Sequence, residues 1–160
     1  MSSRDAILKR IRADLTGGPP VDLPPVPEVW PRKSPTTEQL VTRFTAELEA
    51  VQGEVLRCSS TQQARLKLAD LVDQSGREMI GSVDRPNSRQ VTAELESDRV
   101  AWTQDGWEPR SMAELAAGLV VAEFLLADTG TCAIACGTPQ ERLMCYLPPA
   151  CVVIARVDQL

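Results

Sequence analysis

Proline placement divides this chain into a short N-terminal segment and a longer body. Seven prolines lie between residues 19 and 35. Proline lacks a backbone N–H and clashes with the preceding helical turn, so this stretch can form neither a helix interior nor a central strand. It still carries apolar residues, among them Val21, Leu23 and Trp30. We therefore expect an extended arm, with Trp30 as a packing anchor, that lies across the main body. The alternatives are an arm that docks on a partner subunit and one that docks nowhere.

An amphipathic helix is predicted before the arm, because apolar residues recur there at helical spacing: Ile7, Leu8, Ile11 and Leu15. Asp5 lies in its first turn, and Gly17 and Gly18 followed by prolines are a typical helix end. We divide the chain into residues 1–35, which hold this helix and the arm, and a domain of residues 36–160.

Helix starts in the body are marked by capping boxes, in which a hydroxyl residue precedes Glu or Gln by three positions. The three pairs are Thr36 with Gln39, Ser60 with Gln63, and Ser111 with Glu114. Apolar residues follow the first two at helical spacing: Leu40, Val41, Phe44, Leu48, Val51, and then Leu66, Leu68, Leu71 and Val72. We expect Gly53, Gly76 and Gly118 to close the three helices, and further helical structure over residues 90–98.

Short apolar runs between these helices predict strands. They cover residues 54–58, 79–83, 100–102, 119–121, 131–136 and 151–155. Strands that alternate with helices favour an α/β fold, with a largely parallel sheet flanked by helices in three layers. We place Met79, Met112 and Met144 in the core.

Composition excludes several kinds of chemistry. The chain has 160 residues, enough for one domain with a sizeable core. It contains no histidine, which excludes Ser-His-Asp and Cys-His units and histidine-based zinc or iron sites. The net charge of -5 and the lack of a basic–aromatic stripe argue against nucleic acid and anionic membranes as partners. Neither a GxGxxG nor a P-loop sequence occurs, so we predict no cofactor.

No segment resembles an export signal or a membrane span. The longest apolar run covers residues 119–126 and is interrupted by Glu123, whereas a bilayer requires about 20 apolar residues. The five cysteines form no regular framework. We expect a cytoplasmic protein with reduced thiols.

The cysteines also allow a metal site to be considered, because Cys132, Cys136, Cys145 and Cys151 lie close together in sequence. On one strand, however, Cys132 and Cys136 would be about 13 Å apart at about 3.3 Å per residue. Two thiolates that share a zinc ion each lie about 2.3 Å from it. We therefore predict no metal and regard these residues as small apolar side chains.

Several short motifs in the second half of the chain resemble one known family. Gly-Leu-Val-Val-Ala-Glu at 118–123 and Ala-Asp-Thr-Gly-Thr at 127–131 are similar to the core pattern of the LUD domain of the lactate utilisation protein C family. Arg142, the Leu-Pro-Pro at 147–149 and the apolar run at 152–154 follow in the family's order. The first helix is similar too, while residues 61–110 show little resemblance.

The resemblance implies an α/β fold of the NagB/RpiA/CoA-transferase type. It also implies a role in oxidising L-lactate to pyruvate with iron–sulfur partner proteins. Two departures stand out: Glu123 replaces an Asp and Asp128 replaces a Glu of the family pattern. Family members also continue beyond the last strand to a motif that helps complete the pocket. The alternatives are a fragment, a sequence from which residues are missing, and a lineage that has lost that half of the site.

Residues 128–131 form the first candidate binding site: Asp128, Thr129, Gly130 and Thr131. Glycine permits positive φ, and the backbone N–H groups with the threonine hydroxyls could form a concave anion site. Such a site would take a carboxylate, phosphate or CoA group. The alternative is a polar turn in which Asp128 bonds its own backbone.

Glu123 is the candidate catalytic residue, because it follows a predicted strand and ligands of open α/β sheets collect at strand ends. Coenzyme A transferases of the related fold use a glutamate nucleophile, and Arg142 could bind an anionic group beside it. The alternative is a salt-bridged carboxylate without a catalytic role.

Two functions of different class remain. One is an accessory or enzymatic component of L-lactate or organic-acid oxidation. The other is a non-catalytic domain that binds or senses a small anionic metabolite. Self-association through the N-terminal arm is a further expectation.

Overall fold

The computed structural model describes residues 3–16, 34–103 and 106–160, with the side chains of residues 15 and 16 left out. These residues fall into two compact units, residues 1–34 and 35–160. In the first unit, α1 spans Ser3–Thr16 and confirms the predicted N-terminal helix. The predicted arm, including Trp30, lies almost wholly outside the described residues.

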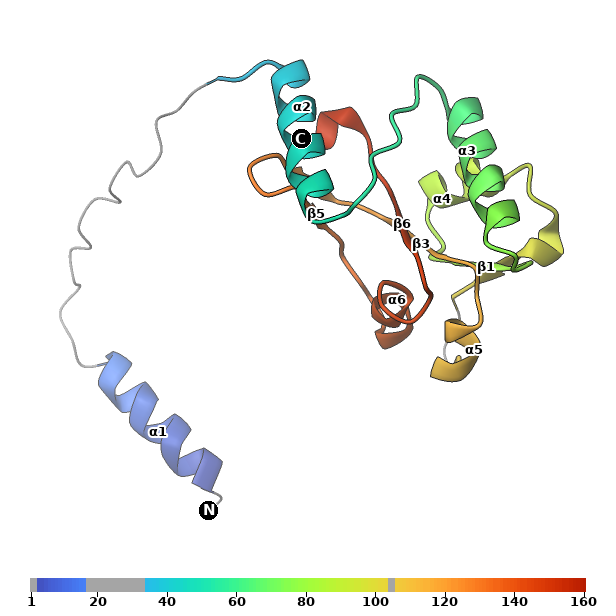
Figure 1. Ribbon diagram of the computed structural model, residues 1–160. Coiled ribbons are helices and arrows are strands. Elements are labelled where there is room, and N and C mark those ends of the chain that lie inside the picture. The colour runs from blue at the N-terminus through green and yellow to red at the C-terminus, as the bar shows by residue number, and fades with distance from the viewer. Residues whose placement is uncertain (1–2, 17–33, 104–105) are drawn as a thin grey trace. The chain divides into compact units, whose positions relative to one another are not determined.

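The second unit is built around a four-stranded parallel sheet (Figure 1). Its strands are β1 (Ile80–Ser82), β2 (Val100–Trp102), β3 (Gly118–Val121) and β6 (Cys151–Ile154), in the spatial order β2-β1-β3-β6. The β3–β6 register runs from Gly118 opposite Cys151 to Val121 opposite Ile154. Two further strands, β4 (Phe124–Leu126) and β5 (Thr131–Ala133), form a separate antiparallel pair.

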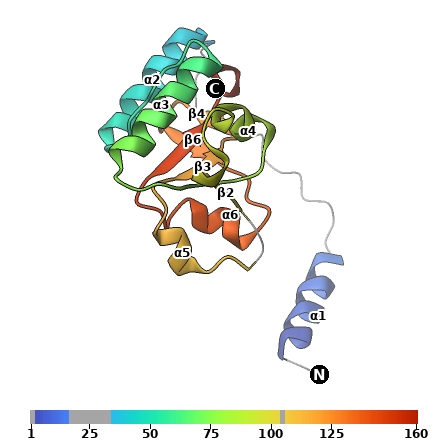
Figure 2. The same cartoon turned by 90° about the vertical axis from the view of Figure 1, so that its right-hand side faces the viewer.

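Helices cover both faces of the sheet, so the predicted three-layer α/β class is confirmed (Figure 2). On one side lie α2 (Thr37–Ala50), α3 (Thr61–Gln74) and α4 (Pro86–Thr92). On the other lie α5 (Pro109–Ala113) and α6 (Pro139–Met144). Short 3-10 turns, η1 (Ser97–Arg99) and η2 (Val157–Gln159), complete the unit.

Alternation along the strands divides the core into two clusters. Leu119 of β3 packs with Val72 of α3 and Val91 of α4. Its neighbour Val120 faces the other side and packs with Met112 of α5 and Met144 of α6. Successive residues of a strand point to opposite faces, so one short apolar strand holds both helical layers.

Two capping predictions hold at atomic detail. The Thr36 hydroxyl accepts the N–H of Gln39 at 3.3 Å, and the Gln39 side chain accepts the N–H of Thr36 at 2.9 Å. Ser60 caps α3 through the N–H of Gln63 at 3.2 Å. A Ser or Thr cap satisfies an N–H that has no partner within its helix.

The third capping prediction is wrong, because α5 ends where it was expected to begin. Pro109 occupies the first turn of α5, and Ser111 lies inside the helix. Proline is favoured at the first helical position, since its missing N–H has no partner there. Helix α4 likewise begins at Pro86, earlier than the expected stretch of residues 90–98.

Two strand predictions are also corrected. Residues 54–58 are extended but pair with no strand of the described chain. Apolar alternation shows which side of a segment is buried, but a strand also needs a neighbour with free backbone groups. Residues 131–136 contribute only β5, because the short turn after β4 returns the chain antiparallel, whereas a parallel pairing needs a long crossover.

A few apolar residues expected in the interior are exposed. Val51 and Leu66 are 70% and 57% exposed, and Met79 is 41% exposed. The helix of Val51 ends at Ala50, and Gln52 rather than Gly53 takes the positive φ that turns the chain. No helix in the described parts of the chain is both long and apolar enough to cross a bilayer.

Candidate functional site

The order of the strands defines a switch point between β1 and β3. From β1 the chain crosses to the edge strand β2. From β3 it crosses in the opposite direction, to the other edge strand β6. The connections that follow two adjacent parallel strands therefore diverge. In open α/β sheets such a divergence opens a crevice at the carboxyl ends of the strands, and ligands bind there.

A cavity of about 260 Å³ occupies this position. Its lining comes from the residues that follow β1, those that follow β3, the segment after β5, and η2. The lining residues are Val83, Arg85, Pro86, Asn87, Val121, Ala122, Glu123, Ile134, Ala135, Cys136 and Gln159. Since pockets for drug-sized ligands measure about 300–1,000 Å³, this one suits a ligand of a few heavy atoms.

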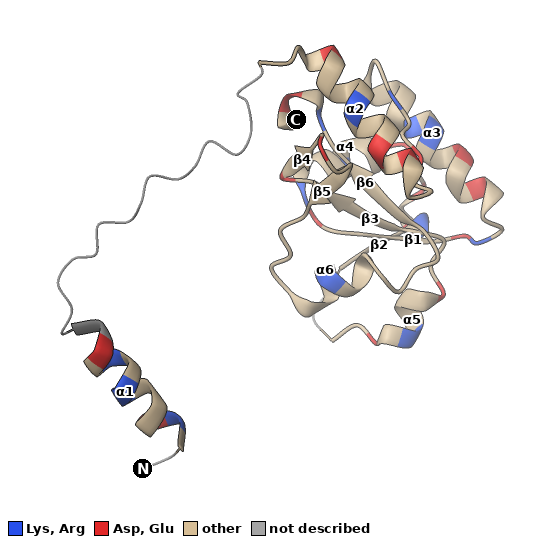
Figure 3. Ribbon diagram, turned by 60° about the vertical axis from the view of Figure 1, so that its left-hand side comes forward, with Lys and Arg blue, Asp and Glu red and all other residues tan. Residues whose placement is uncertain are grey.

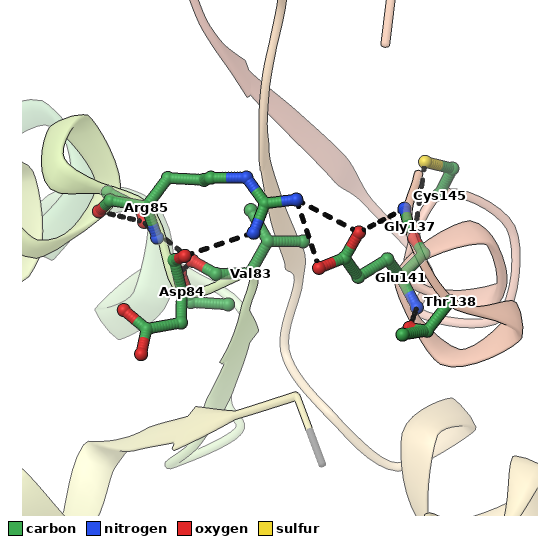
Figure 4. A network of polar contacts seen from close by, with 9 residues as sticks. Val83, Asp84, Arg85, Gly137, Thr138, Glu141 and Cys145 are labelled. Carbon is green, nitrogen blue, oxygen red and sulfur yellow. Dashed lines mark hydrogen bonds and ion pairs between the residues drawn. The ribbon is translucent and has the colours of Figure 1, made fainter. Parts of the chain in front are cut away.

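Arg85 is the cation in this cavity, and Figure 4 shows how it is held. Its Nη2 lies 3.1 Å from both carboxylate oxygens of Glu141, and its Nη1 donates to the Asp84 carbonyl at 3.1 Å. The backbone N–H of Arg85 donates to the hydroxyl of Ser88, a fully buried residue, at 3.1 Å. Both ends of this side chain are therefore anchored.

Glu141, the partner of Arg85 on α6, is also fixed by hydrogen bonds. Its side chain is only 10% exposed, and its Oε2 accepts the backbone N–H of Gly137 at 2.7 Å. Its own N–H donates to the hydroxyl of Thr138, which caps α6, at 3.2 Å. The ion pair thus joins the end of β1 to α6.

The Arg85 side chain remains 39% exposed. A guanidinium carries five N–H donors, and the contacts with Glu141 and Asp84 leave at least two of them available. Available guanidinium donors in a small cavity are suited to a carboxylate, which pairs with arginine through two parallel hydrogen bonds.

Glu123, the predicted catalytic residue, lines the same cavity and has an exposed side chain. Its backbone is fixed, since its N–H donates to the Ala133 carbonyl at 2.8 Å. The Gln159 side chain donates to the carbonyls of Ala122 and Glu123 at 2.6 and 3.2 Å. The cavity therefore offers a carboxylate together with the guanidinium of Arg85.

The other predicted site residues lie elsewhere. Asp128, Thr129 and Gly130 lie in the turn between β4 and β5, Thr131 is the first residue of β5, and none of the four lines the cavity. Asp128 pairs with Arg43 of α2 at 2.8 Å, and the hydroxyls of Thr129 and Thr131 lie 2.9 Å apart.

Gly130 gives this turn a packing role. It has φ +59 and is buried, and a β-carbon there would lie 2.8 Å from the carbonyl carbon of Glu47. Positive φ favours glycine, and so does this close approach to α2. Arg142 is an exposed residue of α6 and is not among the residues that line the cavity with Glu123.

Sequence reasoning missed Arg85 and Glu141. Arg85 comes soon after the predicted strand at residues 79–83, so the strand-end rule that selected Glu123 could have selected it as well. No local signal marks Glu141 as its partner, because 56 residues separate the two.

The cysteines are half-buried, apart from Cys151, which is exposed. Burial and its neighbours Cys151 and Cys136 raise the pKa of the Cys145 thiol to about 12. Within residues 3–16, 34–103 and 106–160, no group of three or more Cys, Asp or Glu residues is arranged to hold a metal ion.

The second unit is therefore a three-layer α/β domain with an open parallel sheet, and its cavity lies at the switch point, the position at which ligands of such sheets usually bind. More narrowly, the chain belongs to the LUD domain family, whose sequence profile matches residues 41–160. No curated protein and no solved structure gives a significant match to the chain.

Proposed function

We propose that this LUD domain binds a small organic carboxylate such as L-lactate in the cavity at the strand ends. The observation that carries the proposal is the position of Arg85, a partly exposed guanidinium anchored by Glu141 in a cavity of about 260 Å³. Family membership supports a role in lactate or organic-acid oxidation. We infer that the domain acts there as an accessory or enzymatic component, resembling lactate utilisation protein C.

The two ionic side chains of the cavity suit the two ends of a hydroxy acid. Arg85 binds the carboxylate through its available N–H groups. Glu123 accepts a hydrogen bond from the hydroxyl and, during oxidation, can hold the proton that this hydroxyl releases. The domain's own contribution is to bind and orient the substrate. The C–H bond at carbon 2 breaks in the oxidation, and its hydrogen and the two electrons leave to the partner iron–sulfur proteins, which are the oxidant.

Calorimetric titration with L-lactate tests the proposal. Arg85→Gln is expected to weaken binding about tenfold to a hundredfold, because hydrogen bonds to charged groups contribute about 1.5–3 kcal/mol. Arg99→Gln is the matched control, since Arg99 also pairs with a carboxylate, that of Asp73 at 2.7 Å, but does not line the cavity. Equal affinity of wild type and Arg85→Gln would disprove the assignment.

Further variants separate the predicted sites from one another. Glu123→Gln is expected to reduce turnover in the presence of the partner proteins more than it reduces lactate binding. Thr129→Val and Arg142→Gln test whether the anion binds at the turn or on α6 instead. If Thr129→Val weakens binding and Arg85→Gln does not, the site is at the predicted turn, and the same result with Arg142→Gln would place it on α6.

The alternative function, a domain that senses an anionic metabolite without catalysis, predicts a different result. L-lactate or another small carboxylate would then bind with the same dependence on Arg85. No turnover would be detected when iron–sulfur proteins of the same organism are added. Glu123→Gln would then change neither the affinity for the carboxylate nor the turnover.

We also infer a cytoplasmic location, with iron–sulfur oxidoreductase subunits and a second copy of the chain as partners. Self-association through the N-terminal helix is supported by Ile7, Leu8 and Ile11, which are exposed on α1. A helix of 14 residues is marginal in water unless its apolar face is covered. Ile7→Asp with Ile11→Asp should lower the mass measured by sedimentation equilibrium, and cell fractionation tests the location.

A further inference from the structure

A second cavity, of about 410 Å³, lies on the side of the sheet covered by α2 and α3. It is lined by both helices, the extended segment of residues 53–58, β3 and β6. It shares no lining residue with the cavity of Arg85 and Glu123. Its volume falls within the range of pockets that bind small molecules, about 300–1,000 Å³. It is open to solvent, since the lining residues Leu56 and Val157 are exposed.

The walls of this cavity are mainly aliphatic. Leu119 and Val152 come from the sheet, Leu48 from α2, and Leu68 and Leu71 from α3. Phe44 is the only aromatic residue among the described lining residues. Such walls favour a flexible hydrocarbon chain, which gains from area burial and dispersion, over a ligand that requires ring stacking.

Charged residues also line the cavity, and their ion pairs decide which of them can contact the polar end of a ligand. Four of them line it: Glu54, Arg57, Lys67 and Arg156. Arg57 makes two hydrogen bonds to Glu38, at 2.7 and 2.8 Å, and Arg156 makes two to Asp158, at 2.9 and 2.7 Å. In each of these arginines two guanidinium nitrogens already form a bidentate contact with a carboxylate, whereas Arg85 contacts Glu141 through Nη2 alone.

Lys67 differs from these arginines, because it has neither an ion pair nor a side-chain hydrogen bond within the described chain. Its side chain is exposed on α3. Glu54 forms no ion pair with it in the described residues, although both line the cavity. Figure 3 shows acidic and basic residues along α2 and α3, the two helices of this wall. A lysine without a counter-ion in the described chain thus contributes to the lining of an aliphatic cavity.

We propose that this cavity binds an aliphatic monocarboxylate of medium chain length, with its hydrocarbon chain between α2, α3 and the sheet and its carboxylate at Lys67. The aliphatic walls select the chain, and the charge of Lys67 selects the anionic end. This site is independent of the cavity proposed to bind L-lactate, so either assignment can fail without the other.

Titration of the full-length protein with decanoate, below its micellar range, tests the site. We expect one saturable site, and octanoate should bind about tenfold more weakly, because two fewer methylenes are buried at about 0.8 kcal/mol each. Lys67→Gln should weaken decanoate binding about twofold to fivefold, and should leave binding of the uncharged 1-decanol unchanged.

Control variants separate the site from nonspecific binding. Lys9→Gln removes a lysine of α1, which belongs to the other compact unit, and Arg85→Gln alters the other cavity, so both should bind decanoate like the wild type. Ala64→Phe adds a ring to a residue that lines the cavity and should abolish binding. The circular dichroism spectrum of this variant shows whether it folds. If it does not fold, the Lys67→Gln variant still tests the site.

The proposal is overturned if decanoate shows no saturable binding. It is also overturned if Lys67→Gln and the wild type bind decanoate equally, or if a folded Ala64→Phe protein still binds it.

Discussion

Gly118 of β3 and Met144 of α6 are in direct backbone contact: a β-carbon on Gly118 would overlap the carbonyl oxygen of Met144 and lie 2.9 Å from its Cγ. Met144 is fully buried. Helix α6 can approach the sheet this closely only because residue 118 has no side chain. The same helix carries Glu141, so this contact also helps to position the ion pair with Arg85.

We expect Gly118→Ala to lower the free energy of unfolding by about 1–3 kcal/mol, the usual cost of overpacking a core. Urea denaturation measures this change. Gly137→Ala is the matched control, because the nearest atom to its β-carbon would be Oε2 of Glu141 at 3.6 Å, an ordinary contact. Equal free energies of unfolding for the two variants would show that α6 does not pack this closely on β3.

Removing Glu141 should destabilise the domain more than removing a surface carboxylate. Glu141→Ala leaves the N–H of Gly137 without its acceptor and Arg85 without its counter-charge, and we expect a cost of about 1–3 kcal/mol. Glu94→Ala removes the exposed pair with Arg65 and should cost less than about 1 kcal/mol. Thermal and urea unfolding of both variants compare the two costs, and equal values would contradict the burial of Glu141.

Two glycines with positive φ allow backbone strain to be separated from steric overlap. Gly76 has φ +66, and a β-carbon there would have no atom of the described chain within 4 Å, whereas Gly130 has φ +59 and is packed against α2. Gly76→Ala should cost about 1–2 kcal/mol through the left-handed conformation alone. Gly130→Ala should cost more, because Glu47 and Leu48 must also shift. A smaller loss for Gly130→Ala than for Gly76→Ala in urea denaturation would show that the turn does not pack on α2.

Stability should fall at alkaline pH in a manner that depends on Cys145. Burial, with smaller effects of Cys151 and Cys136, raises the pKa of its thiol from 9.0 to about 12 in the folded protein. Between these values the unfolded chain loses a proton that the folded chain keeps, so the free energy of unfolding decreases as pH rises above about 9. The contribution is fully present below pH 9.

The Cys145→Ala variant tests this expectation. Its free energy of unfolding should depend less steeply on pH between about 9 and 12 than that of the wild type, because the shifted group is absent. Groups away from Cys136 and Cys151 titrate equally in both proteins, so the difference between the two curves reports Cys145 together with its coupling to these two thiols. Parallel curves would show that the pKa of this thiol is not raised.

Local signals in the sequence predicted much of the fold. The capping box of Thr36 and Gln39 places the start of α2 correctly, because both partners lie within one helical turn. The apolar runs of β1 and β3 are recognisable because strands buried on both faces carry few polar residues, and β6 is an equally apolar run at the edge of the sheet. The strand predicted at residues 54–58 is wrong, and the one predicted at residues 131–136 is too long. Both patterns match a strand, but they carry no information about which neighbour is available for pairing.

The candidate site was predicted in part. Glu123 follows a strand and was selected on that ground, whereas Arg85 lies in a stretch where helix and strand patterns were hard to separate. Its contact with Glu141 joins the end of β1 to α6 and depends on how the layers stack. Residues 128–131 carry a turn signal that a binding loop and a packing turn share, so their composition cannot distinguish the two.

By itself, the sequence determined the α/β class, the positions of α1, α2 and α3 and of the strands of the parallel sheet, the lack of histidine chemistry and the resemblance to the LUD domain. These properties depend on residue types and on spacings within one element. Only the tertiary structure decided which charged groups meet, which strands pair and where two cavities remain. Such features depend on contacts between residues far apart in the chain, and the pattern of a single segment does not encode its partner.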